Sequence, residues 1–355
     1  MAMPTHSTRT VSRSAARTAV AITATFALAA ITACSAPSSG STGGDATDSP
    51  ELTTVTFALS YLPDPSLSGL AYAIEEGLFA EKGIEVEFVP FGGSPAETLV
   101  STGAADMGFG SDLRSTVIAA AAGADVVSLF ATYQHAPYSL AVLADSSYQS
   151  PKELAGTTFG TFGSPYELAI VEDMIAADGG SGAPESVMLS TDIYSALSAG
   201  RIESSLAFPG DAWVIEQGGN EIRSWATTDY GLPDTYSGLL LTSNAFTEAN
   251  PEIVADFTEV MQAGYAAALE DREAANDALL ALFPNDLSPE IIDYVSTVQN
   301  EELIPADSGI VGDQSAEVWQ ENADWLIGHG LLADETGAEV SEYDTSALFS
   351  TEYLN

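Results

Sequence analysis

The segment Val55–Phe79, VTFALSYLPDPSLSGLAYAIEEGLF, most constrains what this chain can fold into. Apolar residues alternate with small or polar ones over residues 55–59, which is typical of a strand, and a Pro-Asp-Pro turn begins at Pro63. Apolar residues then recur at helical spacing as far as Gly77. In an open α/β sheet such a turn lies at the carboxyl edge of the strands, where helix N–H groups can face a ligand. Residues 60–68 are therefore the first candidates for a binding cleft.

Short strands and helices alternate through two further series, with Gly or Pro at most of the boundaries. This rhythm predicts α/β lobes, each with a mainly parallel sheet flanked by helices. The predicted strands are 55–59, 83–89, 105–109, 126–132, 140–144, 157–159, 187–189, 205–208 and 238–242. The predicted helices are 67–77, 96–102, 113–122, 166–177, 192–199, 251–270, 273–282, 289–298 and 316–329. Residues 208–213 are expected to be a loop.

The order of these elements predicts two lobes. The second series forms a smaller lobe, and the return strand with the four late helices rejoins the first. The chain then crosses between the lobes twice, near residues 141 and 236, and these crossings form a hinge. The expected boundaries are 54–140 with 237–355 for lobe 1, and 141–236 for lobe 2.

The N-terminal residues predict an export signal. A positive region with Arg9, Arg13 and Arg17 precedes the short apolar core Ala19–Ile31, which is too short and wrongly flanked for a membrane span. The core ends in Ile-Thr-Ala-Cys, which resembles the lipobox of bacterial lipoproteins. That resemblance implies removal of residues 1–33.

Cys34 is the only cysteine of the chain, so no disulfide partner exists for it. The lipobox resemblance implies that its thiol carries a diacylglycerol; the alternative is a buried or stray cysteine. Residues 34–53 are rich in Ser, Gly and Thr, which is typical of a flexible linker. The mature protein is expected to be extracytoplasmic and lipid-anchored to the cell membrane.

The charge balance is strongly acidic, with 51 acidic against 9 basic residues and a net charge of -42. Nucleic acids and anionic lipid surfaces are therefore poor partners. The acidic charge can be explained by a role in solubility, without any direct role in the choice of ligand. The few basic residues make an anion-binding site a weaker expectation.

Catalytic signals are lacking in the sequence. The histidines His6, His135 and His329 have no metal-ligand spacing to carboxylates or to Cys34, and there is no Walker loop or GxGxxG motif. The Gly160–Ser164 segment does not have the GxSxG spacing of a nucleophile elbow. No catalytic residue, metal or cofactor is predicted.

The strand-to-helix turns instead carry aromatic rings, hydroxyls and carboxylates, which suit a small flat or polar ligand. Each of these residues also has a structural alternative, since Tyr and Trp near turns often pack at the rim of a core. The candidate ligand-binding residues are Tyr61, Pro63, Asp64, Leu67, Ser111, Asp112, Tyr133, Gln134, Phe162, Gly163, Ser164, Tyr166, Glu167, Asp211 and Trp213.

The motifs YLPDPSLSGLAYA, EEGLF, GIEVE, GAADMGFG and SPKELAGTTFGTFGSPYE together resemble the substrate-binding proteins of ABC importers for nitrate, sulfonates, taurine and thiamine pyrimidine precursors. The pyrimidine branch is the most similar, because Gly160–Glu167 has its Gly-x-x-Gly-Ser-Pro-x-Glu element in full and Gln134 and His135 match its Gln-His. The likeness covers residues 55–355. It implies a two-lobe periplasmic-binding-protein-like fold of type II.

The chain departs from that branch where a ligand would bind. Tyr61, Asp64 and Leu67 occupy positions where that branch has Trp, Asn and His. The Gly-Trp-Asp element of the branch is altered at residues 208–213. Tyr61 can still stack, whereas Asp64 is an acceptor only. This suits an amino-bearing heterocycle or indicates another ligand, and Glu167, which is retained, suits an exocyclic amine.

The resemblance implies a monomeric, non-enzymatic receptor that closes on a small-molecule ligand and delivers it to an ABC permease. Alternatives are another solute, such as a riboflavin-like ring, an alkylsulfonate or nitrate, for which Arg114 is the only base near a candidate loop. An enzyme on the same fold, as in fungal pyrimidine-forming proteins, would need a Cys-rich iron motif that this chain lacks. A structural or adhesive lipoprotein would bind no small ligand.

Overall fold

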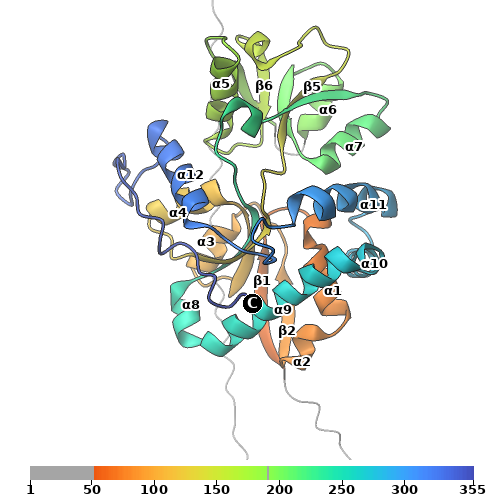
Figure 1. Cartoon of the computed structure of the whole chain (residues 1–355), viewed down its shortest axis with the longest axis vertical. Coiled ribbons are helices and arrows are strands. Elements are labelled where there is room, and N and C mark those ends of the chain that lie inside the picture. The colour runs from red at the N-terminus through yellow and green to blue at the C-terminus, as the bar shows by residue number, and fades with distance from the viewer. Residues whose placement is uncertain (1–51, 190–191) are drawn as a thin grey trace, which may run out of the picture. The chain divides into compact units, whose positions relative to one another are not determined.

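Two five-stranded sheets, each flanked by helices, make up the fold (Figure 1). The computed structural model describes residues 52–189 and 192–355. The predicted signal peptide, Cys34 and nearly all of the predicted linker lie outside the described residues.

The first sheet has the strand order β2-β1-β3-β10-β4. Its strands are β1 (Thr53–Leu59), β2 (Ile84–Val89), β3 (Met107–Asp112), β4 (Val127–Tyr133) and β10 (Ser237–Thr242). β1 pairs in parallel with β2 and β3, whereas β10 runs antiparallel to β3 and β4. β4 and β10 are buried along their whole length, which places the core of this lobe on both faces of the sheet.

Helices from both ends of the chain cover the first sheet (Figure 1). They are α1 (Ser68–Glu75), α2 (Leu78–Glu81), α3 (Ala96–Ser101), α4 (Leu113–Ala121), α8 (Asn244–Ala249), α9 (Pro251–Glu270), α10 (Arg272–Leu282), α11 (Pro289–Val298) and α12 (Ala316–Gly328). Local sequence signals set several of their ends: Asp112 caps α4 by accepting the Ser115 N–H at 2.8 Å, and Pro251 occupies the first turn of α9. Phe57 of β1 stacks on Phe257 of α9, with ring centroids 5.8 Å apart.

The second sheet has the order β7-β6-β8-β5-β9. Its strands are β5 (Ser139–Leu143), β6 (Thr158–Thr161), β7 (Glu185–Met188), β8 (Ser204–Ala207) and β9 (Ile222–Ala226). Its helices are α5 (Glu167–Ala177), α6 (Ile193–Ser198) and α7 (Pro209–Gln217). β5 runs antiparallel to its neighbours β8 and β9, while β6 is parallel to β7 and β8. In each sheet one strand is thus reversed, and it is the strand by which the chain enters after a crossing.

These sheets confirm the predicted two-lobe α/β fold, but several elements differ from the prediction. The short helices α2 and α8 were not predicted. Residues 208–213 are not a loop, because α7 begins at Pro209, whose fixed φ suits a first helical turn. β9 was not predicted, because as an edge strand it is only partly buried and shows no clear alternation. β3 begins two residues later and ends three residues later than the predicted 105–109. It continues through Gly110, where a Cβ would lie 2.5 Å from Leu241.

Residues 134–138 and 227–236 connect the two sheets. The predicted lobe boundaries at 140/141 and 236/237 stay predictions. None of the helices in the described part of the chain has the length and apolar character to cross a membrane.

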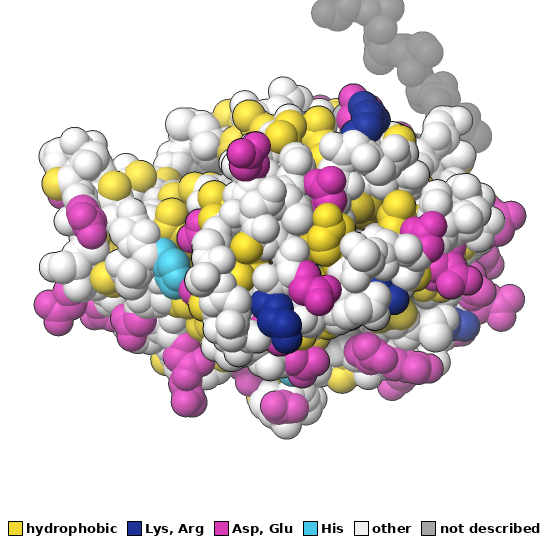
Figure 2. All heavy atoms as spheres, turned by 90° about the horizontal axis from the view of Figure 1, so that it is seen from above, with side chains coloured by type: hydrophobic (Ala, Val, Ile, Leu, Met, Phe, Trp, Pro, Cys, Tyr) yellow, Lys and Arg dark blue, Asp and Glu magenta, His cyan; other side chains and the backbone are white. Residues whose placement is uncertain are grey.

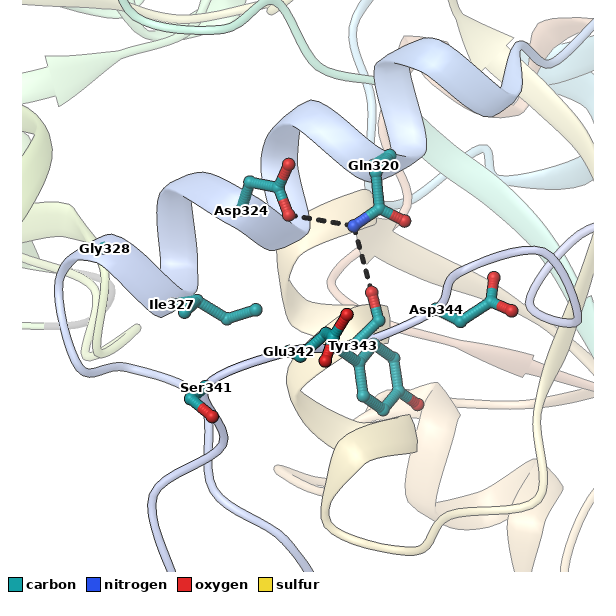
Figure 3. A pocket seen from close by; sticks show the side chains of 8 residues that line it. All are labelled: Gln320, Asp324, Ile327, Gly328, Ser341, Glu342, Tyr343 and Asp344. Atoms are coloured by element: carbon teal, nitrogen blue, oxygen red, sulfur yellow. Dashed lines mark hydrogen bonds between the residues drawn. The ribbon is translucent and has the colours of Figure 1, made fainter.

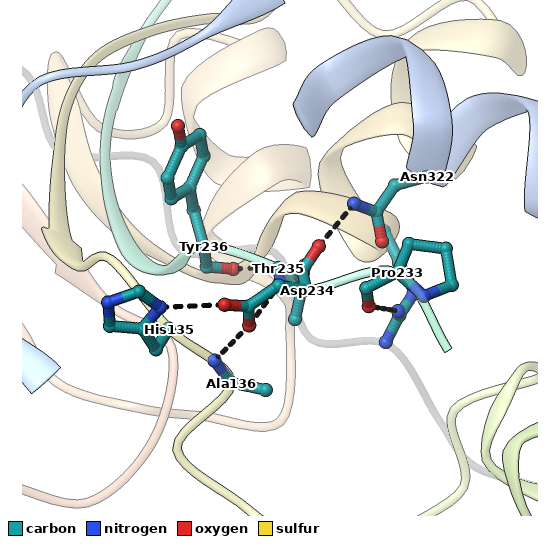
Figure 4. Close-up of polar contacts among 8 residues, drawn as sticks. His135, Ala136, Pro233, Asp234, Thr235, Tyr236 and Asn322 are labelled. Atoms are coloured by element: carbon teal, nitrogen blue, oxygen red, sulfur yellow. Dashed lines mark hydrogen bonds and ion pairs between the residues drawn. The ribbon is translucent and has the colours of Figure 1, made fainter. Parts of the chain in front are cut away.

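Asp234 ties the two connections together (Figure 4). Its Oδ2 lies 2.6 Å from His135 Nδ1, and its Oδ1 accepts the Ala136 N–H at 2.8 Å. Its backbone oxygen accepts from Asn322 Nδ2 of α12 at 2.7 Å. The crossing segments are therefore held to each other and to a helix of the first lobe.

The α1–α9 contact allows a stability prediction. A Cβ on Gly264 of α9 would lie 2.2 Å from the Gly69 backbone oxygen of α1, so Gly264→Ala must push the helices apart. We expect it to lower the free energy of unfolding in urea by about 1–3 kcal/mol. Gly328→Ala is the matched control, because nothing lies within 4 Å of a Cβ there; it should change stability by at most about 1 kcal/mol, upward. Equal effects of the two changes would contradict this packing.

Candidate functional site

The candidate residues lie mainly at the ends of β1, β3, β6 and β8. Within each sheet these strands are parallel, so their carboxyl ends meet at one edge of that sheet. The turn after β1 and the turns after β6 and β8 supply the aromatic and acidic groups described next.

The turn after β1 presents one exposed ring and one carboxylate. The Tyr61 side chain is 43% exposed, and its ring centroid lies 5.5 Å from that of Phe91. Asp64 caps the short 3-10 helix η1 (Pro65–Leu67) by accepting the Ser66 N–H at 2.7 Å through Oδ1. Desolvation raises the pKa of Asp64, and the hydrogen bonds from Ser66 only partly offset it. A positively charged group of a ligand would therefore stabilise the ionised form of this carboxylate.

The loop after β6 is folded around a buried carboxylate. Glu167 Oε2 accepts the Phe162 N–H at 2.9 Å, and Oε1 accepts the Ser164 N–H at 2.8 Å. Gly163 between them has φ 111°, a conformation that favours glycine. Desolvation raises the pKa of Glu167 in spite of these bonds. Glu167 thus holds its own loop, and any ligand amine would share a carboxylate that already has two N–H partners.

Aromatic rings of the second lobe gather around that loop. The Phe162 ring centroid lies 5.9 Å from that of Tyr194 on α6 and 6.2 Å from that of Phe208. Phe208 in turn makes an edge contact with Tyr138 at 5.6 Å and remains 36% exposed. Rings at these separations can pack against a flat ligand as they pack against each other.

Asp211 is bonded to this aromatic group, and its charge acts on the turn after β1. Its Oδ2 accepts from the Tyr194 hydroxyl and from the Phe208 N–H, the latter at 2.9 Å. Desolvation raises the pKa of Asp211 to about 6, and the Asp64 charge adds to the rise. The Tyr61 pKa is raised by desolvation and then by Asp211 and Asp64. Tyr61 and Asp64 of the first lobe thus lie within electrostatic reach of Asp211 of the second.

Two predicted site residues bond to each other between the lobes. The Tyr166 hydroxyl, at the start of α5, donates to Asp112 Oδ2, and both side chains are buried. Beside them the buried Arg114 donates to the Tyr138 hydroxyl and, at 2.9 Å, to the Pro233 oxygen. Its guanidinium also lies 4.9 Å from the centroid of the Trp325 ring. Both terminal nitrogens of Arg114 are therefore bonded within the fold, while its buried Nε has no hydrogen-bond partner among the described residues.

Three further predicted residues serve the packing of the first lobe. Leu67 is 3% exposed and belongs to the core. The Tyr133 hydroxyl accepts from Gln299 Nε2, and Gln134 Nε2 donates to the Ala131 and Asp313 oxygens at 2.9 and 3.1 Å. We leave these three out of the proposed ligand contacts.

The remaining predicted residues lie nearer the surface. Ser111 is exposed, with its backbone oxygen accepting from Ser237 Oγ at 2.7 Å, while Pro63 and Trp213 are half-buried. Tyr194 was not predicted: its helix was, but nothing in the sequence tells which face of a six-residue helix meets Asp211. Its spacing to Asp211 in the chain carries no motif.

Acidic side chains are scattered over the face shown in Figure 2, as the composition implies. A hollow of about 640 Å³ lies along α12 and the C-terminal tail, with Gln320, Asp324 and Tyr343 among its lining residues (Figure 3). None of the predicted site residues lines it. Among the described residues, no three His, Cys, Asp or Glu side chains are grouped as a metal site would require.

Comparison with known proteins identifies the family. Residues 64–275 match the sequence model of a family described as "NMT1/THI5 like". The chain belongs to the NMT1/THI5-like family. A curated relative, the formylaminopyrimidine-binding protein of Halalkalibacterium halodurans, is 28% identical over 304 residues, covering 83% of this chain and 91% of that protein. The expected family and its pyrimidine branch are thereby confirmed.

Solved structures support the fold of this NMT1/THI5-like protein. The alkanesulfonate-binding protein SsuA from Xanthomonas axonopodis pv. citri, bound to MOPS, has a TM-score of 0.63 at 18% identity, covering 80% of this chain and 96% of its own. A Candida albicans protein described as having the generic periplasmic binding protein structural fold has a TM-score of 0.62 at 14% identity, covering 86% and 98%. At these identities the likeness shows the fold alone.

The raised pKa of Asp211 allows a prediction of pH dependence. Because the folded protein ionises this carboxyl less readily than the unfolded chain does, its ionisation costs stability. The cost grows between the unfolded pKa of 3.8 and the folded pKa of about 6, and it is constant at higher pH. Asp211→Asn keeps an oxygen acceptor for Tyr194 and Phe208 but cannot ionise. We expect its melting temperature to exceed that of the wild type at pH 8 and the difference to shrink toward pH 4.

Asp211→Ala is the control, because it removes both the charge and the acceptor, and it should be less stable than Asp211→Asn at every pH. An advantage of the Asn variant that did not change with pH would contradict the shifted pKa.

Proposed function

We propose that this protein is the extracytoplasmic solute-binding component of an ABC importer, and that it captures a small amino-bearing heterocycle of the thiamine pyrimidine-precursor kind. The observation that supports the proposal is that Tyr61 and Asp64 of one lobe and Tyr194 and Asp211 of the other influence one another electrostatically. The pyrimidine-binding relative supports the ligand class. In this proposal the protein is a monomeric receptor without enzymatic activity.

Binding is driven by closure of the two lobes on the ring. A ligand favours the closed form only through contacts it makes better there, so it must touch both lobes. Tyr61 and Phe162 would pack on the ring faces, and Asp64 and Asp211 would accept hydrogen bonds from its amino group and ring N–H groups. Each of these carboxylates has an oxygen, Asp64 Oδ2 and Asp211 Oδ1, that bonds no other described residue in the structure.

An anionic solute is the second candidate, and no specific observation favours it. Nitrate or an alkylsulfonate would need basic groups or several free N–H donors at the site. Arg114, the only base near the predicted loops, is 1% exposed and bonds Tyr138 and Pro233. The carboxylates of Asp64 and Asp211 would repel an anion.

Titration calorimetry with formylaminopyrimidine and with the hydroxymethyl analogue tests the ligand class. About ten heavy atoms at roughly 0.8–1 kcal/mol each predict a dissociation constant in the micromolar range or below. Tyr61→Ala should weaken binding by about tenfold through loss of stacking. Tyr343→Ala, which alters the hollow on α12, is the control and should leave affinity unchanged.

The possible outcomes test the identity of the ligand separately from the assignment as a solute-binding protein. No heat and no thermal shift with either pyrimidine would remove the pyrimidine assignment. Binding of methanesulfonate in their place would favour the anion reading. Loss of affinity in the Tyr343 variant, and not in the Tyr61 variant, would move the site to α12.

We also propose that Cys34 carries the lipid that anchors the protein outside the cell. Cys34→Ser should abolish incorporation of radiolabelled fatty acid and move the protein from the membrane fraction to the soluble fraction. Ser7→Ala, in the predicted signal but away from the lipobox, is the control and should stay labelled. Labelling that persisted in the Cys34 variant would contradict the anchor.

A further inference from the structure

The end of α12 contacts α5 at a place separate from the candidate binding residues. Trp325 Nε1 donates to Asp173 Oδ2 at 2.7 Å, and His329 Nε2 lies 3.0 Å from Asp173 Oδ1. Asp173 belongs to α5, which flanks the second sheet. α12 packs on α4 through buried residues such as Trp319 and belongs with the first sheet. One carboxylate thus bridges the two lobes.

The geometry around His329 fits only a charged ring. Its Nδ1 lies 2.8 Å from the Trp325 backbone oxygen, while its Nε2 faces the Asp173 carboxylate. A backbone oxygen and an ionised carboxylate can only accept hydrogen bonds. A neutral imidazole has one N–H and satisfies one of them, whereas an imidazolium satisfies both. The arrangement is therefore complete when His329 carries a proton.

The charges around the ring favour the same state. On α5, Glu172 adds its charge to that of Asp173, and after α12 Glu339 lies beside Gly330. Asp324 of α12 faces the hollow of Figure 3 instead. Arg114 of α4 stacks on the Trp325 ring, 4.9 Å from its centroid, and is the basic neighbour.

Partial burial lowers the pKa of His329. The Trp325 oxygen and the Asp173 carboxylate, with Glu172 beyond it, outweigh that effect, so the pKa of His329 lies above its ordinary value. When the lobes separate, the ring loses Asp173 and its pKa falls back. The stabilisation of the joined state is thus fully present below the ordinary histidine pKa and is lost as pH rises through the raised one.

We propose that His329, Asp173 and Trp325 form a pH-sensitive latch that holds the two lobes together while His329 is protonated and loosens when the proton leaves. The latch acts at the opening of the lobes and not on the ligand. It goes beyond the proposed function, because it works in the ligand-free protein whatever the solute is.

Small-angle scattering of the ligand-free protein between pH 5.5 and 8.5 tests the latch. We expect the radius of gyration of the wild type to rise with pH and that of His329→Gln to stay constant over the same range. Asp324→Asn is the matched control: Asp324 lies on the same helix but faces the hollow of Figure 3, and its variant should keep the pH-dependent rise. A wild-type radius that does not change, or a rise that persists in His329→Gln, would overturn the proposal.

A second readout does not depend on lobe motion. The His329 ring, titrated by nuclear magnetic resonance and assigned with the Gln variant, should show a pKa above 6.5, and Asp173→Asn should lower it by about one unit. The Asn variant retains an acceptor for Trp325, so the fold is kept. A His329 pKa that Asp173→Asn leaves unchanged would overturn the latch.

Discussion

The hydrogen bonds of the Asp112 carboxylate are the interactions on which the placement of the two lobes' loops and helices depends. It ends β3, caps α4 and accepts the Tyr166 hydroxyl from the start of α5. One side chain thereby completes a helix of the first lobe and fixes the entry to a helix of the second. The loop that precedes α5 carries Phe162 and the backbone N–H groups that donate to the Glu167 carboxylate. The placement of that loop relative to the first lobe follows from this bond and its neighbours around Arg114.

Much of the fold could be predicted from the sequence, because its signals are local. The apolar alternation of residues 55–59, the cap at Asp112 and the apolar spacing of α9 each decide one element without help from the rest of the chain. α7 and β9 could not be predicted in this way. Gly210 interrupts the first, and the second lies at a sheet edge where burial imposes little alternation.

The site was predictable only as a set of loops. Turns at the carboxyl ends of strands identify which segments can meet a ligand. They do not tell which of their side chains are buried or hydrogen-bonded within the protein and so cannot contact a ligand. Tyr133 is hydrogen-bonded to Gln299, and Gln134 is hydrogen-bonded to the backbone oxygen of Asp313. Pairings between residues so far apart in the chain leave no pattern in the local sequence. The carboxylates of Glu167 and Asp211 hold backbone N–H groups of their own loops, so the groups that would meet an amine also shape the walls around it.

The position of β10 has a consequence for how the chain reaches its native state. This strand lies between β3 and β4, yet more than a hundred residues, including the whole second sheet, separate it in sequence from β4. Until β10 is in place, β3 is paired only with β1 and has one unpaired edge, and β4 has no partner strand in the sheet; joining them requires a long loop to close first. The first lobe is therefore expected to complete its folding after the second. Until then, the unpaired strand edges of partly folded chains are the expected sites of aggregation.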